Sequence, residues 1–260
     1  MTRGALVAAG LARYEEDGIV WFESLLAASA GESMADVPTL VLVHGANDHA
    51  GTWFAVVPDL AHTHRVIIPD LAGHGESEPK SGPLPISLIL EKLEAVIGRE
   101  RDITLLGNSL GGWLALLYTL RHPERVSRLF LESSGGLARP LSSPLVARDR
   151  EEALRILTAV HGPKYQAPEW VIEALLQRAA ASPMLRFTEV AEHDIEARLG
   201  EIEAPTTLIW GADDGVVPLD YARALQQAIP HSELRVIEGA AHIPHLQQPE
   251  RFLQCLTATS

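Results

Sequence analysis

Two kinds of hydrophobic pattern alternate along the chain. Short, nearly continuous apolar runs are typical of strands that a sheet buries on both faces. Between them, apolar residues recur at helical spacing, most clearly in residues 86–97. Strands are expected at 39–43, 65–69, 103–106, 126–131, 206–210 and 234–237. Helices are expected at 53–61 with an interruption at Pro58, at 86–97, from 110 to about 121, at 219–229 and from 249 onward.

The N-terminal part adds two more expected strands. Residues 12–26 indicate a pair of edge strands around the turn signal Asp17-Gly18, and the acidic stretch that ends at Asp36 indicates a surface turn. Because strands then alternate with helices, the chain predicts an α/β fold. The expected architecture is a mostly parallel sheet of about eight strands with helices on both faces.

The pattern changes character after Gly135-Gly136. Helical patterns at 148–160, 168–181 and 184–199 follow one another between two strands, with no strand of their own. This arrangement is typical of an inserted helical cap. We therefore expect a core domain of residues 1–135 and 203–260 and a cap of residues 136–202.

Composition narrows the classes of function. The net charge of −13 argues against a nucleic-acid or anionic-membrane surface. Cys255 is the only cysteine, so no disulfide can form within the chain. The apolar run at the N-terminus is too short for a transmembrane segment and is a poor signal peptide. We expect a cytoplasmic monomer or homodimer that binds no nucleic acid.

The segment Gly107-Asn108-Ser109-Leu110-Gly111 joins an expected strand to an expected helix. A serine at such a sharp turn has strained φ/ψ angles and an exposed hydroxyl. Glycines on either side let strand and helix approach closely. The helix that starts after Ser109 directs N–H groups at the turn, which suits an oxyanion. The alternative is a glycine-rich turn whose serine only caps the helix.

Two further residues of the right chemistry follow expected strand ends. Asp214 comes after the strand at 206–210, and His242 comes after the strand at 234–237. Loops after parallel strands gather at one sheet edge, so a hydroxyl, an imidazole and a carboxylate are expected together there. Taken singly, Asp214 could be a turn residue and His242 a surface histidine. His44 and Asp70 are expected to have structural roles, the latter by accepting loop N–H groups.

These segments together resemble the α/β-hydrolase-fold superfamily over nearly the whole chain. The matching pieces are Val43-His44-Gly45, the loop 69–77, the turn 107–112, the loop 211–218 and the segments 239–242 and 248–252. The resemblance implies a Ser109–His242–Asp214 triad, since the family pattern Gly-x-x-Asp-x-x-x-Pro selects Asp214 over Asp213. It also implies that the backbone N–H groups of Ala46 and Leu110 form the oxyanion hole.

Within the superfamily, the chain is most similar to carboxylesterases and lipases. We therefore expect an enzyme that cleaves a small-molecule ester with an apolar acyl or alcohol part through an acyl-enzyme. The chain also resembles carbon–carbon bond hydrolases of aromatic meta-cleavage products. It departs from them at Gly45-Ala46-Asn47-Asp48 and at Ile243, whereas Arg186 could act as their substrate-binding arginine. A receptor-like member of the fold remains a third interpretation. An aspartate nucleophile would indicate a dehalogenase or epoxide hydrolase, and Ser109 speaks against both.

Large apolar residues of the expected cap are candidates for the substrate pocket. Among them, Trp170, Met184 and Phe187 are expected to include at least one that faces the substrate. No cysteine–histidine cluster resembles a zinc site, and no glycine-rich loop has dinucleotide spacing. No metal or cofactor is therefore expected.

Overall fold

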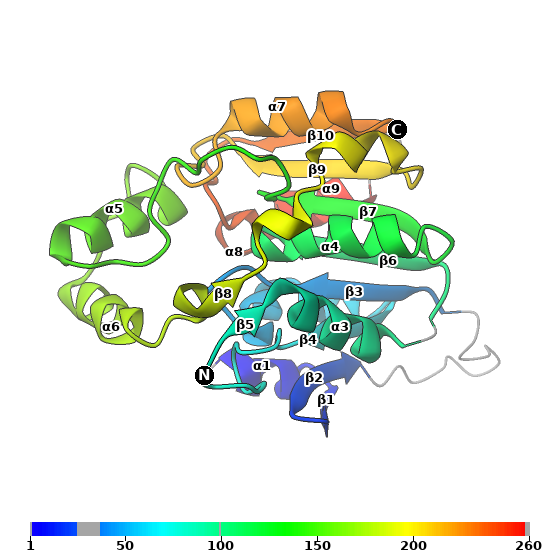
Figure 1. Cartoon of the computed structure of the whole chain (residues 1–260), viewed down its shortest axis with the longest axis horizontal. Helices are drawn as coiled ribbons and strands as arrows, with labels where there is room; N and C mark the ends of the chain where they lie inside the picture. The colour runs from blue at the N-terminus through cyan, green and yellow to red at the C-terminus, as the bar shows by residue number, and fades with distance from the viewer. Residues whose placement is uncertain (1, 25–36, 99, 258–260) are drawn as a thin grey trace.

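The computed structural model describes residues 2–24, 37–98 and 100–257, which form a layered α/β structure around one large sheet (Figure 1). The strands are β1 (Leu11–Glu16), β2 (Ile19–Ser24), β3 (Thr39–Val43), β4 (Arg65–Pro69), β5 (Leu84–Pro85), β6 (Ile103–Asn108), β7 (Val126–Glu132), β8 (Phe187–Thr188), β9 (Thr206–Gly211) and β10 (Ser232–Ile237). The expected surface turn that ends at Asp36 lies outside the described residues.

Helices and 3-10 turns connect these strands. The helices are α1 (Thr2–Ala8), α2 (Val57–Leu60), α3 (Ile86–Ile97), α4 (Leu110–Arg121), α5 (Arg150–His161), α6 (Glu169–Ala179), α7 (Leu219–Ala228), α8 (Pro244–Gln247) and α9 (Pro249–Thr257). The 3-10 turns are η2 (Ala50–Ala55), η3 (Pro183–Arg186), η4 (Ala191–His193) and η5 (Glu196–Glu201).

The main sheet has eight strands in the order β1-β2-β4-β3-β6-β7-β9-β10. Strands β1 and β2 pair antiparallel with each other, β2 also pairs antiparallel with β4, and the other neighbours are parallel. The expectation of a mostly parallel sheet of about eight strands is confirmed.

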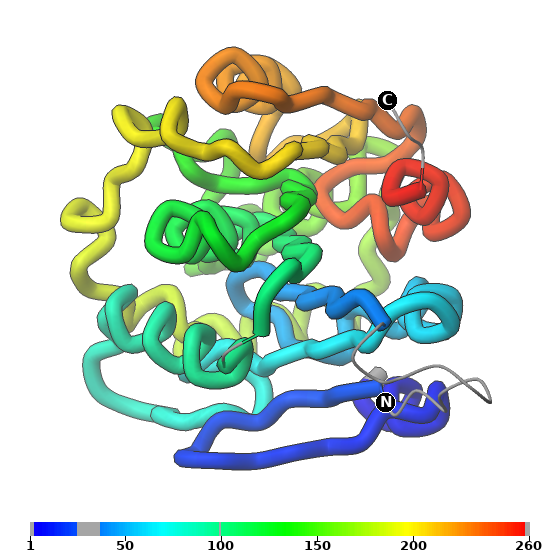
Figure 2. Tube along the Cα trace, turned by 90° about the vertical axis from the view of Figure 1, so that its right-hand side faces the viewer, coloured from blue at the N-terminus to red at the C-terminus, as the bar shows by residue number. Residues whose placement is uncertain are grey.

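Helices cover both faces of the sheet, as Figure 2 shows from the side. Within β3, Val41 and Val43 face the cluster built on α3, α4 and α7, whereas Leu40 and Leu42 face the cluster built on α1, η2, α2 and α9. This strand is buried along its whole length. The continuous apolar pattern of the strand follows from this two-sided burial.

Three local expectations need correction. Residues 184–199 form no α-helix; the segment contains most of η3, then β8, η4 and the start of η5. Strand β8 pairs with β5, so the insertion has a short strand of its own. Residues 53–61 divide into η2 and α2, and Pro58 lies in the first turn of α2, where a proline is tolerated. The helix α1 was not expected.

Candidate active site

The site forms where the strand order reverses. From β3 the chain passes to β4 on one side, and then through α3 to β6 on the other side. The ends of β3 and β6 are therefore neighbours, with Val43 paired to Gly107. Such a switch point is where open α/β sheets bind ligands. It brings the loop that holds Ala46 beside the turn that holds Ser109.

Ser109 has the strained backbone that the turn requires, with φ 54° and ψ −113°. Its N–H donates to the Glu132 carbonyl oxygen at 2.9 Å, which joins the turn to β7. A Cβ atom at Gly107 would collide with the Gly111 backbone, and one at Gly111 would collide with the Val43 carbonyl oxygen. Because backbone lies on both sides, only glycine fits at these two positions.

Asp214 and His242 form a buried pair. The Asp214 Oδ2 atom lies 3.0 Å from His242 Nδ1, and its Oδ1 atom accepts from the N–H groups of Val216 and Val217, each at 2.9 Å. These bonds fix the position of the carboxylate. Because the carboxylate binds Nδ1, Nε2 is the ring nitrogen that stays available for another partner. The amide of Asn108 donates to the His242 carbonyl oxygen at 3.1 Å and so ties the histidine loop to the residue before Ser109. Within the described part of the chain, no hydrogen bond joins the Ser109 hydroxyl to His242 itself.

The C-terminus of α5 holds both loops from the other side. The last carbonyls of a helix have no partner within it. Here Ala159 O accepts from Gly215 N at 3.1 Å, Val160 O accepts from His242 N at 3.1 Å, and His161 O accepts from the Gln247 amide at 2.9 Å. The loops of Asp214 and His242 therefore cap this helix.

His44 orders the loop that holds Ala46. The Leu71 N–H donates to His44 Nε2 at 3.0 Å, so the ring proton sits on Nδ1, which donates to the Gly45 carbonyl oxygen at 2.8 Å. A trans peptide directs its N–H away from its carbonyl. Fixing the Gly45 carbonyl therefore fixes the direction of the Ala46 N–H. The structural roles expected for His44 and for Asp70, which accepts from Ala50 N and Glu76 N at 2.6 Å each, are confirmed.

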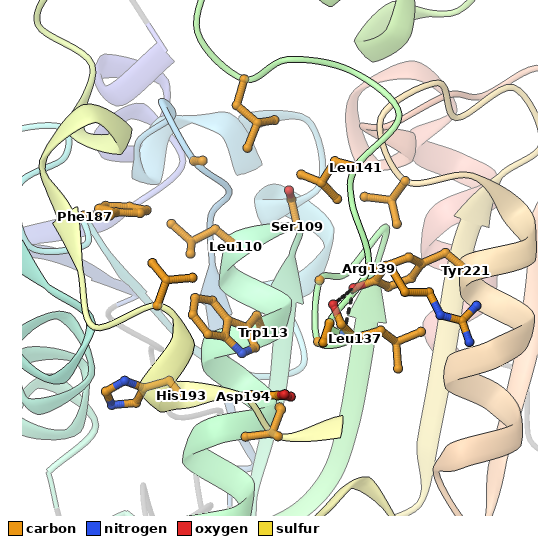
Figure 3. A pocket seen from close by; sticks show the side chains of 18 of the residues that line it. Ser109, Leu110, Trp113, Leu137, Arg139, Leu141, Phe187, His193, Asp194 and Tyr221 are labelled. Atoms are coloured by element: carbon orange, nitrogen blue, oxygen red, sulfur yellow. Dashed lines mark hydrogen bonds between the residues drawn. The ribbon is translucent and has the colours of Figure 1, made fainter. Parts of the chain in front are cut away.

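A cavity of about 480 Å³ opens beside Ser109 (Figure 3). Most of its wall is apolar, and the wall includes Ala46, Leu110, Trp113, Leu137, Leu141, Leu145, Met184, Phe187, Val190, Ile195 and Val217. Burial raises the pKa of Tyr221 in this wall, and its hydroxyl exchanges hydrogen bonds with the backbone of Leu137 at 2.7 and 3.1 Å. The cavity suits an apolar group placed next to the serine.

The three candidate pocket residues of the insertion lie in different places. Met184 and Phe187 are part of the cavity wall. The expectation that Trp170 belongs to the pocket is wrong, because its side chain on α6 is 71% exposed and contributes nothing to that wall. Arg186 also lies outside the wall: its guanidinium donates to the Pro79 carbonyl oxygen at 2.9 Å from both terminal nitrogens, and to the Gly73 carbonyl oxygen at 3.4 Å.

Sequence reasoning missed a contact between the Ala46 loop and the insertion. Asn47, at φ 59°, donates from its amide to the Leu145 carbonyl oxygen at 2.9 Å and accepts from the Ser182 hydroxyl at 2.6 Å. Asparagine tolerates this left-handed backbone better than most residues. The signal was therefore local, an asparagine in a tight loop, but its partners lie about 100 and 135 residues away and could not be read from the pattern.

In the parts of the chain that the structure covers, no group of three or more His, Cys, Asp or Glu residues is placed to hold a metal ion. No helix among the described residues has the length and apolar character needed to cross a membrane.

Comparison with known proteins places these features in context. A family model described as the alpha/beta hydrolase family matches residues 40–254. A pimeloyl-(acyl-carrier protein) methyl ester esterase of Nitrosomonas europaea is 30% identical over 251 residues, which cover 87% of this chain and 97% of the relative. A 2-hydroxy-6-oxononadienedioate/2-hydroxy-6-oxononatrienedioate hydrolase of Cupriavidus pinatubonensis is 28% identical over 249 residues, which cover 84% and 85%. The crystal structure of a membrane phospholipase A superposes with a TM-score of 0.76 at 26% identity, covering 98% of this chain and 87% of the other.

Proposed function

This chain belongs to the alpha/beta hydrolase family, and we propose that it cleaves carboxylic esters with Ser109 as nucleophile, His242 as general base and Asp214 as the group that orients the imidazole. One observation carries the proposal. The buried Asp214–His242 pair is tied through Asn108 to a strained serine that opens on an apolar cavity. Folding alone does not require a serine, a histidine and an aspartate together in this arrangement.

The proposed reaction proceeds in two halves. His242 Nε2 takes the proton from Ser109 Oγ as that oxygen attacks the ester carbonyl, and the C=O electrons move onto the oxygen. The N–H groups of Ala46 and Leu110 stabilise this oxyanion; each such donor is typically worth about 10²- to 10³-fold in rate. His242 then protonates the departing alcohol. A water molecule repeats the sequence on the acyl-enzyme and releases the acid.

The wall of the cavity supports an apolar acyl or alcohol group in the substrate. We assign the selection of chain length to Met184 and Phe187, which come from the insertion, and treat residues 136–202 as a cap on the core of residues 1–135 and 203–260. The relative that acts on a methyl ester supports an ester as the substrate class.

Carbon–carbon bond hydrolysis is the second candidate, because one relative is named for that type of substrate. Its dienedioate substrates are anions, which need a cation in the pocket. Arg186 is the residue kept open for this role, but its guanidinium bonds three times to backbone carbonyls of the core and does not line the cavity. Arg186 is therefore engaged elsewhere. The wall does contain another cation, Arg139, so a carbon–carbon substrate would have to use Arg139 in place of Arg186.

The test uses Ser109→Ala with two substrate classes. p-Nitrophenyl esters of increasing acyl length and a dienoate meta-cleavage product are offered to the wild type and to the folded variant. We expect ester turnover in the wild type and a loss of about 10⁴-fold or more in kcat in the variant. A serine-directed phosphonate should modify Ser109 alone. Modification of another serine, or turnover of the dienoate without ester turnover, would overturn the proposal.

A further inference from the structure

A second carboxylate–histidine pair lies beneath the site. Glu132, the last residue of β7, and His245, in α8, both have side chains that are 0% exposed. The His245 Nδ1 atom lies 2.9 and 2.8 Å from the two Glu132 carboxylate oxygens, and the His245 backbone N–H donates to Oε1 at 2.8 Å. The far ring nitrogen, Nε2, lies 3.1 Å from the hydroxyl of Thr52. Every polar atom of the imidazole is therefore bonded.

This group does not face substrate. Thr52 is 5% exposed, and Thr52, Glu132 and His245 are all absent from the wall of the cavity beside Ser109. The ring of Trp53 packs on the imidazole with centroids 4.3 Å apart. Thr52, His245 and Glu132 carry the same chemical groups as Ser109, His242 and Asp214, namely a hydroxyl, an imidazole and a carboxylate. Because the threonine is buried, no ester could reach it. The proposed ester reaction gives the pair no chemical step.

The pair instead connects two segments that the proposed reaction requires to lie together, the turn of Ser109 and the segment of His242. The carbonyl oxygen of Glu132 accepts from Ser109 N at 2.9 Å, and its carboxylate holds His245, three residues after His242. One residue thus contacts the nucleophile turn through its backbone and the histidine segment through its side chain. The Asn108–His242 bond is a second link across the same gap.

We propose that Glu132 and His245 are positioning residues that set where the His242 ring lies relative to Ser109, an inference that rests on the proposed ester chemistry. A buried carboxylate is stable only when its oxygens are bonded, and its bonds are directional, so the pair fixes the segment more narrowly than apolar packing would. A misplacement of about 1 Å in a catalytic group can cost roughly 10²-fold in rate.

The decisive variants change the pair and keep its volume. Glu132→Gln keeps one acceptor oxygen but not the charge, His245→Asn keeps a donor near the Nδ1 position, and His245→Leu keeps bulk without a donor. In folded protein below its Tm, Glu132→Gln and His245→Leu should lower kcat about tenfold or more with KM changed less than about twofold. His245→Asn should retain more of the activity than His245→Leu. Phosphonylation of Ser109 should slow by the same factor as kcat.

Leu6→Ala is the matched control. Leu6 lies on α1 in the same buried cluster as Trp53, so its truncation lowers stability but removes none of the hydrogen bonds of the pair. Its kcat should stay at the wild-type value below its Tm. If Glu132→Gln lowers Tm as Leu6→Ala does and leaves kcat and phosphonylation unchanged, the pair is merely structural and the proposal fails. If Glu132→Gln does not fold, Thr52→Val, which breaks only the outer bond, takes its place with the same two readouts.

A measurement without substrate separates this inference from the ester proposal. In protein labelled with ¹⁵N-histidine, the Nδ1–H proton of His242, which faces Asp214, should shift or broaden in Glu132→Gln and not in Leu6→Ala. An unchanged resonance would overturn the positioning role. A wild type that cleaves no ester and resists the phosphonate would overturn the ester chemistry, while the resonance would still report on position.

Discussion

After a linker, residues 136–145, which also contributes to the cavity wall, the insertion between β7 and β9 has two halves that contact the site in different ways. The helical hairpin (residues 150–179, α5 and α6) lies beyond the strand ends in Figure 1, has a small core of its own and supplies no residue to the cavity wall. The pocket segment (residues 183–201) is irregular, yet it supplies seven wall residues, namely Met184, Phe187, Val190, Ala191, His193, Asp194 and Ile195.

The hairpin contributes to the site through backbone. Its last carbonyls hold the loops of Asp214 and His242, whereas the pocket segment presents side chains to the cavity. The difference teaches that the regular helices of such an insertion can hold loops in place through backbone contacts while the irregular part forms the wall of a cavity. The two halves should therefore fail differently: damage to the hairpin should lower kcat, and damage to the pocket segment should change substrate preference.

The largest expected effect tests whether a loop that α5 holds carries the chemistry. Asp214→Asn should lower kcat by about 10³- to 10⁴-fold, because an amide favours the wrong imidazole tautomer. Asp213→Asn is the matched control, since Asp213 is the exposed neighbour in the same loop. Steady-state kinetics on one short ester measures both. Equal losses of kcat in the two variants would show that Asp214 has no special chemical role. The proposed contribution of α5, which acts through this loop, would then fail as well.

The second prediction pushes the hairpin away from that loop. A Cβ atom at Gly215 would lie 2.8 Å from the Cα of Ala159 and 3.1 Å from its Cβ, so Gly215→Ala must displace the end of α5. We expect kcat to fall about tenfold with the chain-length profile intact, as for a small misplacement of catalytic groups. Gly200→Ala is the control because no atom lies within 4 Å of its added Cβ. A changed profile with an unchanged kcat would reverse the roles of the two halves.

The third prediction concerns the pocket segment. Met184→Ala and Phe187→Ala should shift the preferred acyl length, with kcat/KM ratios between long and short esters changing by about tenfold, the scale of one or two methylene contacts. Phosphonylation of Ser109 should be unaffected. Trp170→Ala, on the exposed face of α6, should change stability by less than about 0.5 kcal/mol and leave the profile as it is. Wild-type profiles in both pocket variants would mean that this segment only packs.

The smallest expected effect is a dependence of local stability on pH that is confined to the hairpin. Hydrogen bonds to Arg148 lower the pKa of Glu152 to about 2 at the start of α5. A carboxyl whose pKa is depressed stabilises the fold above its ordinary pKa, and that contribution is lost as pH falls through the folded value. Local opening of α5, measured by hydrogen exchange, should therefore increase as pH falls from about 4.5 to 2, and Glu152→Gln should flatten this dependence. No such change is expected in the pocket segment.

Local patterns predicted the elements that local interactions build. Helix α3 runs from Ile86 to Ile97 as expected, because its apolar spacing is bounded by Pro85 and Gly98. The expectation of a helix at 184–199 is wrong, because the apolar residues there have helix-like spacing without belonging to one continuous helix. Pro183 opens a short 3-10 turn there, and Phe187 then pairs with Leu84, about 100 residues earlier. A pairing between residues so far apart cannot be recognised from a short stretch of sequence.

The residues of the candidate site show the same difference between local signals and long-range contacts. Ser109, Asp214 and His242 could be found because each follows an apolar strand, and the topology of parallel strands brings such positions together. The pair of Glu132 and His245 was missed, although a charge at the end of a buried strand is a signal that some partner must exist. Which of the chain's 11 histidines provides it depends on three-dimensional packing.

The contacts between α5 and the two loops have a consequence for how this insertion can change. Three main-chain carbonyls make the contacts, and every residue type offers the same carbonyl. The hairpin can therefore diverge in sequence, or be exchanged for another, while its docking survives. Three requirements remain: the last turn must end where His161 ends, a small residue must face Gly215, and an apolar residue must replace Val160, which packs on the main core. A graft designed to these conditions would keep the contacts to the loops of Asp214 and His242 and leave the pocket segment free for separate redesign.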